Sequence, residues 1–229
     1  MAGRVSDLLN SNSIFKDNRA DLLGGAIDLY YIKKVHTYQC HFVNNNVRES
    51  GGALAIAAYK LIIIDRCLFI GNVDKHSGDG GALYLKKAIM IKAMYCYFRG
   101  NLAIRNWGGA IFIDLITATF ETFISMLHCT FSKNLASTAA AVSVREVSHF
   151  DAFNCSFVHN KAYLRAGCIH IREADSISVA KCYFGENKDS IINLFPSLDY
   201  TDGGCGLKIQ KANTVSLHEC TFVQNTEYY

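Results

Sequence analysis

Apolar and polar residues alternate along seven short stretches of the chain, and each stretch begins with a pair of small residues. The stretches read GGAIDL (24–29), GGALAI (51–56), GGALYL (80–85), GGAIFI (108–113), AAAVSV (139–144), AGCIHI (166–171) and GCGLKI (204–209). Their apolar residues, such as Leu54 and Ile56, are two positions apart, which is the period of a β-strand that buries one face. Each stretch therefore predicts a short strand that faces the core.

A second cluster recurs in phase with the first. It reads SIFKDN (13–18), CHFVNN (40–45), CLFIGN (67–72), CYFRGN (96–101), CTFSKN (129–134), CSFVHN (155–160), CYFGEN (182–187) and CTFVQN (220–225). Apolar residues five and three positions before the cysteine, such as Ile62 and Ile64, predict another strand. The alternation breaks between this strand and the cysteine, so we expect a corner there and three short inward-facing strands in each repeat.

A repeat of about 27 residues with three short strands cannot bury its own apolar face, whereas stacked coils can. The spacing therefore predicts an all-β, single-domain, right-handed parallel β-helix of about seven to eight coils. A leucine-rich horseshoe, the main alternative, needs a helical half-repeat, and no 3.6-residue pattern lies between the strands. We expect an N-terminal cap segment at 1–12, in which Ser6 or Asp7 starts a helical turn, and the β-helix at 13–229 with loop excursions at 114–123 and 188–203.

The repeated polar residues are predicted to be structural. Asparagine tolerates left-handed backbone geometry at sharp bends, and its amide can bond to the asparagine of the next coil. The cysteines are a whole coil apart, unlike the close pairs of metal sites, and are interpreted as buried free thiols, although disulfides between neighbours are geometrically allowed. These ladder residues are Cys40, Cys67, Cys96, Cys129, Cys155, Cys182, Cys220, Asn18, Asn45, Asn72, Asn101, Asn134, Asn160, Asn187 and Asn225. No metal and no cofactor are expected, and the polar run VDKHSGD (73–79) is predicted to be an exposed connection.

Gly-Gly-Ala-Ile together with Phe-x-x-Asn resembles the repeat signature of the chlamydial polymorphic membrane proteins, within the wider pectin-lyase-like β-helix group. The resemblance covers residues 13–225. It implies an adhesin-like or scaffold β-helix without catalysis. The chain differs from that family in its shorter body and in the absence of a recognisable signal or translocating barrel.

Composition, charge and cysteine content indicate the cellular compartment in which the protein is expected. Half of the 229 residues are hydrophobic and 19% are charged, as in soluble globular proteins, and a net charge of +3 is too small to predict nucleic-acid binding. No apolar run resembles a secretory signal or is long enough to span a membrane. Nine cysteines without an export signal favour a reducing compartment. We therefore expect a cytoplasmic protein, with the cell surface as the alternative location.

Catalytic β-helices gather acidic, histidine or basic residues on one outward face. The outward positions of the Gly-Gly-Ala strands are Asp28, Ala55, Tyr84, Phe112, Ser143, His170 and Lys208, and those of the cysteine strands are His41, Leu68, Tyr97, Thr130, Ser156, Tyr183 and Thr221. No two carboxylates stack in either set. The best pair, His170 beside Lys208, is interpreted as a solvated surface pair, so no enzyme is predicted.

Two features are predicted to be binding surfaces. The five-residue loops after the first Gly-Gly-Ala strands carry lysines and no acidic residue, and we call Lys33, Lys34, Lys60, Lys86 and Lys87 the lysine edge. Such an edge suits an acidic protein surface or a polyanion, although its lysines could equally keep a sheet-rich rod soluble. The excursion at 188–203 brings apolar residues out of the repeat, either to cap the body or to dock a partner: Ile191, Ile192, Leu194, Phe195 and Tyr200.

These features predict a non-catalytic, intracellular structural or scaffold protein. It would dock with other proteins in a larger assembly through the lysine edge, the long loops and an open C-terminal end. An acidic filament, such as one of the cytoskeleton, would suit the basic edge. A surface adhesin or carbohydrate-binding β-helix is the alternative, and a polysaccharide lyase or hydrolase is the third possibility.

Overall fold

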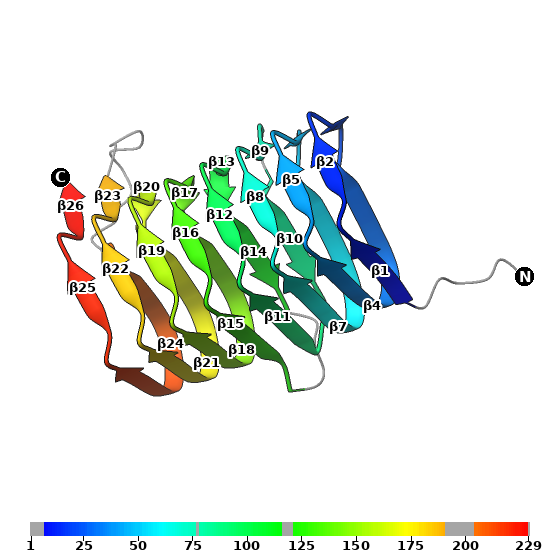
Figure 1. Ribbon diagram of the computed structural model, residues 1–229. Coiled ribbons are helices and arrows are strands. Elements are labelled where there is room, and N and C mark those ends of the chain that lie inside the picture. Colours follow the sequence, from blue (N-terminus) through cyan, green and yellow to red (C-terminus); the bar gives the residue numbers. More distant parts are fainter. Residues whose placement is uncertain (1–6, 77, 116–120, 191–203, 229) are drawn as a thin grey trace, which may run out of the picture.

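The computed structural model describes residues 7–76, 78–115, 121–190 and 204–228. Every regular element in these ranges is a β-strand, and all the strands pair in parallel with strands of neighbouring coils. The strands form three sheets that wind around one long axis (Figure 1). The all-β parallel solenoid predicted from the repeat is therefore confirmed.

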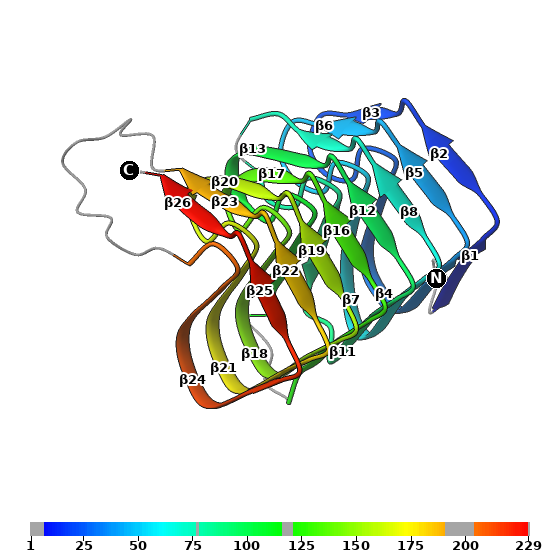
Figure 2. The same ribbon diagram turned by 60° about the vertical axis from the view of Figure 1, so that its left-hand side comes forward.

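Sheet 1 contains ten strands and forms the broad curved side of the solenoid (Figure 2). Its strands are β1 (Asp7–Ser11), β4 (Ile27–Tyr38), β7 (Leu54–Asp65), β10 (Leu83–Lys86), β11 (Met90–Met94), β14 (Ile111–Asp114), β15 (Phe123–Leu127), β18 (Val142–Phe153), β21 (Ile169–Ala180) and β24 (Leu207–His218).

Sheets 2 and 3 contain eight short strands each. Sheet 2 consists of β2 (Ile14–Lys16), β5 (His41–Val43), β8 (Leu68–Ile70), β12 (Tyr97–Arg99), β16 (Thr130–Ser132), β19 (Ser156–Val158), β22 (Tyr183–Gly185) and β25 (Thr221–Val223). Sheet 3 consists of β3 (Arg19–Ala20), β6 (Asn46–Val47), β9 (Val73–Asp74), β13 (Leu102–Trp107), β17 (Leu135–Thr138), β20 (Lys161–Arg165), β23 (Lys188–Ser190) and β26 (Thr226–Tyr228).

The division of each coil into strands differs from the sequence expectation. The Gly-Gly-Ala strand and the strand before the cysteine belong to one sheet, and in β18 and β21 a single strand runs through the bend between them. In-register pairs such as Glu146 with Glu173 keep the main-chain ladder intact there, so these bends are not loops. The third sheet is built from residues after each asparagine, including Val73–Asp74, which the sequence predicts to be a connection.

The first described residues also form a strand. Residues Asp7–Ser11 are β1, which pairs with the second half of β4 from Lys34 to Tyr38. The helical turn expected at Asp7 is therefore not formed, because parallel pairing satisfies this backbone.

The phenylalanines of sheet 2 form the centre of the core. Their rings stack face to face along the axis, with centroids 4.6 to 4.9 Å apart, in the order Phe15, Phe42, Phe69, Phe98, Phe131, Phe157, Phe184 and Phe222. This separation matches the strand spacing of a β-sheet, so each coil presents its ring in register with the next.

The asparagines form a continuous hydrogen-bonded ladder beside the phenylalanines. In each step the backbone N–H and the Nδ2 group of one asparagine donate to Oδ1 of the asparagine in the next coil, at 2.8 to 3.1 Å. The left-handed backbone expected at the asparagine falls on the residue before it, such as Gly100 (φ 62°) or Lys133 (φ 55°). The preceding residue turns the chain, and the asparagine is thereby free to aim its side chain inward.

The Gly-Gly corners require glycine for two different reasons. Gly51 has φ of 72°, in the left-handed region that favours glycine. Gly52 has an ordinary backbone, but a Cβ atom there would lie 1.9 Å from the carbonyl oxygen of Gly81 in the next coil. The corners therefore allow stacked main chains to approach closely.

Candidate functional site

The outer face of sheet 1 carries the column predicted for the Gly-Gly-Ala strands. Strand register places its members side by side, in the order Asp28, Ala55, Tyr84, Phe112, Ser143, His170 and Lys208. A hollow of about 60 Å³ lies over this face in the first coils. Its lining includes Ala55, Ala57, Tyr30 and Tyr84, together with the charged side chains of Asp28 and Lys86.

Trp107 covers the middle of this column. Its ring lies edge to face against Phe112 and His170, at centroid distances of 6.2 and 5.6 Å. Both partners are almost completely buried, with 1% and 2% of their surface exposed, and Ser143 between them is also buried. The prediction of a solvated His170–Lys208 pair is therefore wrong for His170, although the two residues are in-register neighbours. Trp107 belongs to sheet 3, so its contact with His170 of sheet 1 joins two sides of the coil. The local sequence around either residue does not reveal this contact.

Lys86 belongs to a charged cluster rather than to an open edge. Its ammonium lies 4.0 Å from the Asp114 carboxylate and 4.7 Å from the centroid of the Tyr84 ring. The same carboxylate lies 3.6 Å from the Arg145 guanidinium, which also lies over the Trp107 ring. Lys86 is consequently neutralised in part, and it contributes less free positive charge than the sequence suggests.

The other lysines of the lysine edge lie along the bend of sheet 1 in the first three coils. Lys34, Lys60 and Lys87 are exposed and Lys33 is half-buried. In the described parts of the chain, none of these four forms an ion pair. The structure thus brings four cations to one bend without local neutralisation.

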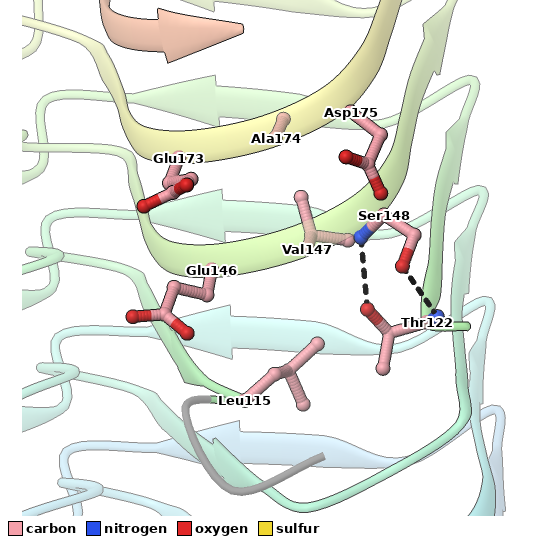
Figure 3. A pocket seen from close by; sticks show the side chains of 8 residues that line it. All are labelled: Leu115, Thr122, Glu146, Val147, Ser148, Glu173, Ala174 and Asp175. Atoms are coloured by element: carbon pink, nitrogen blue, oxygen red, sulfur yellow. Dashed lines mark hydrogen bonds between the residues drawn. The ribbon is translucent and has the colours of Figure 1, made fainter. Parts of the chain in front are cut away.

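The same bend carries acidic residues in the later coils (Figure 3). Glu146 of β18 and Glu173 of β21 are in-register neighbours, and Glu173 is paired with Lys211 of β24. They help to line a hollow of about 190 Å³, together with Asp175, Leu115, Thr122, Val147, Ser148 and Ala174. The hollow is fixed on one side by Thr122 and Ser148, whose backbone N–H groups each donate to the other's hydroxyl, at 3.1 and 2.9 Å.

Sequence reasoning did not identify this acidic hollow. It compared only the two predicted strand faces, and no carboxylates stack in those columns. Aligning REVSH (145–149) with READS (172–176) as strand rather than loop would have placed the two glutamates together. The apolar excursion residues Ile191, Ile192, Leu194, Phe195 and Tyr200 lie outside the described residues, as do residues 116–120, so their role as binding residues stays a prediction.

The cysteines are all free thiols. Within the column each sulfur bonds to nearby backbone: the Cys67 thiol donates to the carbonyls of Thr37 and Asp65, at 3.4 and 3.3 Å, and accepts the N–H of Cys40 at 3.4 Å. Burial raises the pKa of the Cys168 thiol well above its usual range. The described residues contain no cluster of histidine, cysteine and acidic side chains that could hold a metal ion. These thiols therefore act as small core side chains.

We expect the nine thiols to fall into two reactivity classes. Cys205 and Cys220 are partly exposed, whereas the other seven are buried. An aromatic disulfide reagent should therefore modify two thiols quickly in the native protein and nine after denaturation without a reductant. Native labelling of Cys96 or Cys129 at the rate of Cys220, or fewer than nine thiols after denaturation, would contradict this assignment.

A scan of protein-family models, a search of curated proteins and a search of solved structures each found no match to this chain. Within the described ranges, no helix is long and apolar enough to cross a bilayer. Function is therefore inferred from the residues themselves.

Proposed function

We propose that this protein is a non-catalytic structural or scaffold component that docks in a larger intracellular assembly through its lysine edge. The observation that carries the proposal is the group of four lysines on one bend, three of them exposed, without an ion pair in the described part of the chain. Charged groups that are not locally neutralised create a field that attracts an oppositely charged surface. The partner is accordingly an acidic protein surface, for which a cytoskeletal filament is one candidate.

The architecture behind the lysine edge supports this role. The edge belongs to β4, β7 and the turn after β10. β4 and β7 pair in parallel, with a register shift between Ile32 and Lys34, and β10 pairs in parallel with β7 as far as Lys86. Strands spaced at about 4.8 Å hold the side chains of successive coils at a fixed repeat. A group of cations held on successive coils suits a partner that presents several acidic groups.

The proposal is for a protein without catalysis, because the most reactive groups on this face are engaged or covered. His170 and Ser143 are buried beside the Trp107 ring. The Asp114 carboxylate lies between the cations of Lys86 and Arg145. A substrate would have to displace Trp107 to reach the histidine.

An exported adhesin or carbohydrate-binding β-helix is the second candidate, which rests on the resemblance of the repeat to chlamydial polymorphic membrane proteins of the pectin-lyase-like group. Exposed aromatic side chains such as Tyr95, 49% exposed, and Phe153, 42% exposed, favour it, because such rings can pack on sugars. The Tyr95 ring is, however, stacked on His128 at 5.0 Å and lies beneath the Arg66 guanidinium. With both faces occupied, Tyr95 is a poor platform for a sugar. A polysaccharide lyase or hydrolase ranks third.

Charge reversal at the lysine edge should release the protein from its assembly. In native cell extracts we expect the wild-type chain to elute in a complex and the variant Lys33→Glu/Lys34→Glu/Lys60→Glu/Lys87→Glu to elute as a free chain of 25.4 kDa. The matched control, Lys16→Glu/Lys92→Glu/Lys133→Glu/Lys161→Glu, has the same charge change on other surfaces and should remain bound. A wild-type chain that elutes alone, or an edge variant that remains in the complex, would overturn the proposal.

A further inference from the structure

The bend of sheet 1 carries opposite charges in its two halves. The first three coils contribute five lysines and no acidic residue, at 30–34, 57–61 and 86–90. The described parts of the next three coils, at 114–115, 121–123, 145–149 and 172–176, contribute five acidic residues and two arginines. The bends of β7 and β21 are four strand steps apart, or about 19 Å along the axis. The two halves meet at the Lys86–Asp114 ion pair, whereas the lysines of β4 and β7 and the carboxylates of β18 and β21 lie farther apart than the Debye length of about 8 Å at physiological salt. These outer groups do not neutralise each other within one chain.

The acidic half is hollowed and only partly neutralised. Asp114 lies between Lys86 and Arg145, Glu121 lies 3.6 Å from the His149 ring, and Glu173 is paired with Lys211. Asp175 accepts a hydrogen bond from Asn213 at 3.2 Å, whereas Glu146 has no hydrogen bond or ion pair with a described residue. Three of these acidic side chains help to line the 190 Å³ hollow, with Glu146 and Glu173 on one side and Asp175 on the other (Figure 3). Because a water molecule occupies about 30 Å³ in the liquid, this space can admit a side chain from another molecule. A cationic side chain is the one that its carboxylates favour.

The basic half offers both cations and an aromatic anchor. Tyr30 and Tyr31 are 58% and 63% exposed and lie edge to face, with centroids 4.3 Å apart, and only Ile32 separates them from Lys33 and Lys34. Exposed tyrosines are enriched among the residues that dominate protein interfaces. Two tyrosines beside exposed lysines therefore form a projecting surface that is opposite in charge to the acidic hollow.

We propose that the partner of the lysine edge is a second copy of this chain, which binds antiparallel so that the lysine edge of each copy meets the acidic hollow of the other. This inference rests on the proposed function, because it uses the same lysine edge and names what occupies it. A two-fold arrangement makes both contacts at once, since the same surface is used by each partner. The contact is electrostatic and exposed, so it weakens as salt rises.

A charge-swap experiment tests this pairing. One variant carries Lys33→Glu, Lys34→Glu and Lys60→Glu, and the other carries Glu146→Lys and Asp175→Lys. Each variant alone sets like charges against each other across the interface, so each should be monomeric in sedimentation equilibrium. An equimolar mixture sets opposite charges together at both contacts and should restore a dimer. The control Lys16→Glu/Lys133→Glu/Lys161→Glu should dimerise like the wild type. For both, the dissociation constant should be about tenfold larger at 500 mM than at 50 mM salt.

The outcomes separate this inference from the proposed function. A wild-type chain that is monomeric at low salt, or a mixture that does not form a dimer although both variants keep the wild-type circular dichroism, would overturn the second copy as partner. If the edge-reversed chain nevertheless leaves its native complex, docking through the lysine edge stands and the occupant is another acidic protein. If it stays in the complex, both proposals fail.

Discussion

Replacing Asn101 with alanine is expected to lower the free energy of unfolding by about 3–5 kcal/mol, because it interrupts the ladder at its most buried section. The Asn101 side chain accepts the backbone N–H and the Nδ2 group of Asn72, both at 3.0 Å, and its own Nδ2 donates to Asn134 and to the carbonyl of Phe69. Alanine leaves the backbone N–H of Asn72 without its acceptor in a region closed to water, and the Nδ2 group of Asn72 and Oδ1 of Asn134 each lose one of their two hydrogen bonds. Each buried polar group that loses its bond costs about 1–3 kcal/mol.

Asn18→Ala provides the matched comparison. Asn18 donates to Asn45 through its backbone and its amide, in a partly buried setting at the first step of the ladder. Its loss should cost only about 1 kcal/mol. Urea unfolding followed by far-ultraviolet circular dichroism and by fluorescence of Trp107, the only tryptophan of the chain, measures both variants. Equal losses of unfolding free energy for Asn101→Ala and Asn18→Ala would contradict a ladder whose buried steps contribute more stability than its first step.

Asp74→Asn is expected to stabilise the protein at neutral pH. The Asp74 side chain is fully buried at an inward position of β9, where its neighbours in adjacent coils are Val47 and Ala103. Oδ1 accepts the backbone N–H of His76 at 3.3 Å, and Oδ2 has no hydrogen-bond partner among the residues that the structure describes. Burial raises the pKa of this carboxyl to about 7, and the nearby Asp79 and Glu49 carboxylates act in the same direction.

The sign of the pH effect follows from this raised pKa. In the unfolded chain the carboxyl loses its proton near pH 3.8, whereas in the folded chain it keeps the proton until about pH 7. Between these values unfolding releases a proton, so the stability contributed by Asp74 is lost as pH rises from about 4 to about 7 and is constant above that. At about 1.4 kcal/mol per pH unit, the loss at neutral pH is on the order of 4 kcal/mol.

Asparagine preserves the shape of the side chain and has no charge to bury. Asp74→Asn should therefore raise the unfolding free energy by about 2–4 kcal/mol at pH 7.5 and by almost nothing at pH 3.5. Urea unfolding at both pH values measures this, with the exposed Asp151→Asn as control. A variant less stable than the wild type at pH 7.5, or one that keeps the same pH dependence, would contradict the account.

Spacing alone was sufficient to predict the columns of this fold, because residues one repeat apart meet in register in a solenoid. The stacked rings of Phe69 and Phe98 follow from that rule. Asp74 was missed because β9 is only two residues long, and two residues show no alternation. Its burial depends on the neighbouring coils rather than on its own segment.

The candidate surface was predicted only in part for a similar reason. The positions of Lys34 and Lys60 on one bend follow from the repeat, but the pairing of Lys86 with Asp114 joins two coils across the outer face. The position of Trp107 against His170 depends on how sheet 3 meets sheet 1. Predicting a contact between two columns requires the shape of the coil in cross-section, and the period of the sequence does not reveal that shape.

Docking through the lysine edge can be measured most directly by lysine acetylation footprinting of the native assembly. The isolated chain and the assembled chain would be treated briefly with an acetylating reagent and compared by mass spectrometry, with Lys16, Lys133 and Lys161 as internal references. We expect Lys33, Lys34, Lys60 and Lys87 to react at least several-fold more slowly in the assembly, while the reference lysines are unchanged. Equal labelling of these four lysines in the two states would contradict the proposal that this edge is where the protein docks.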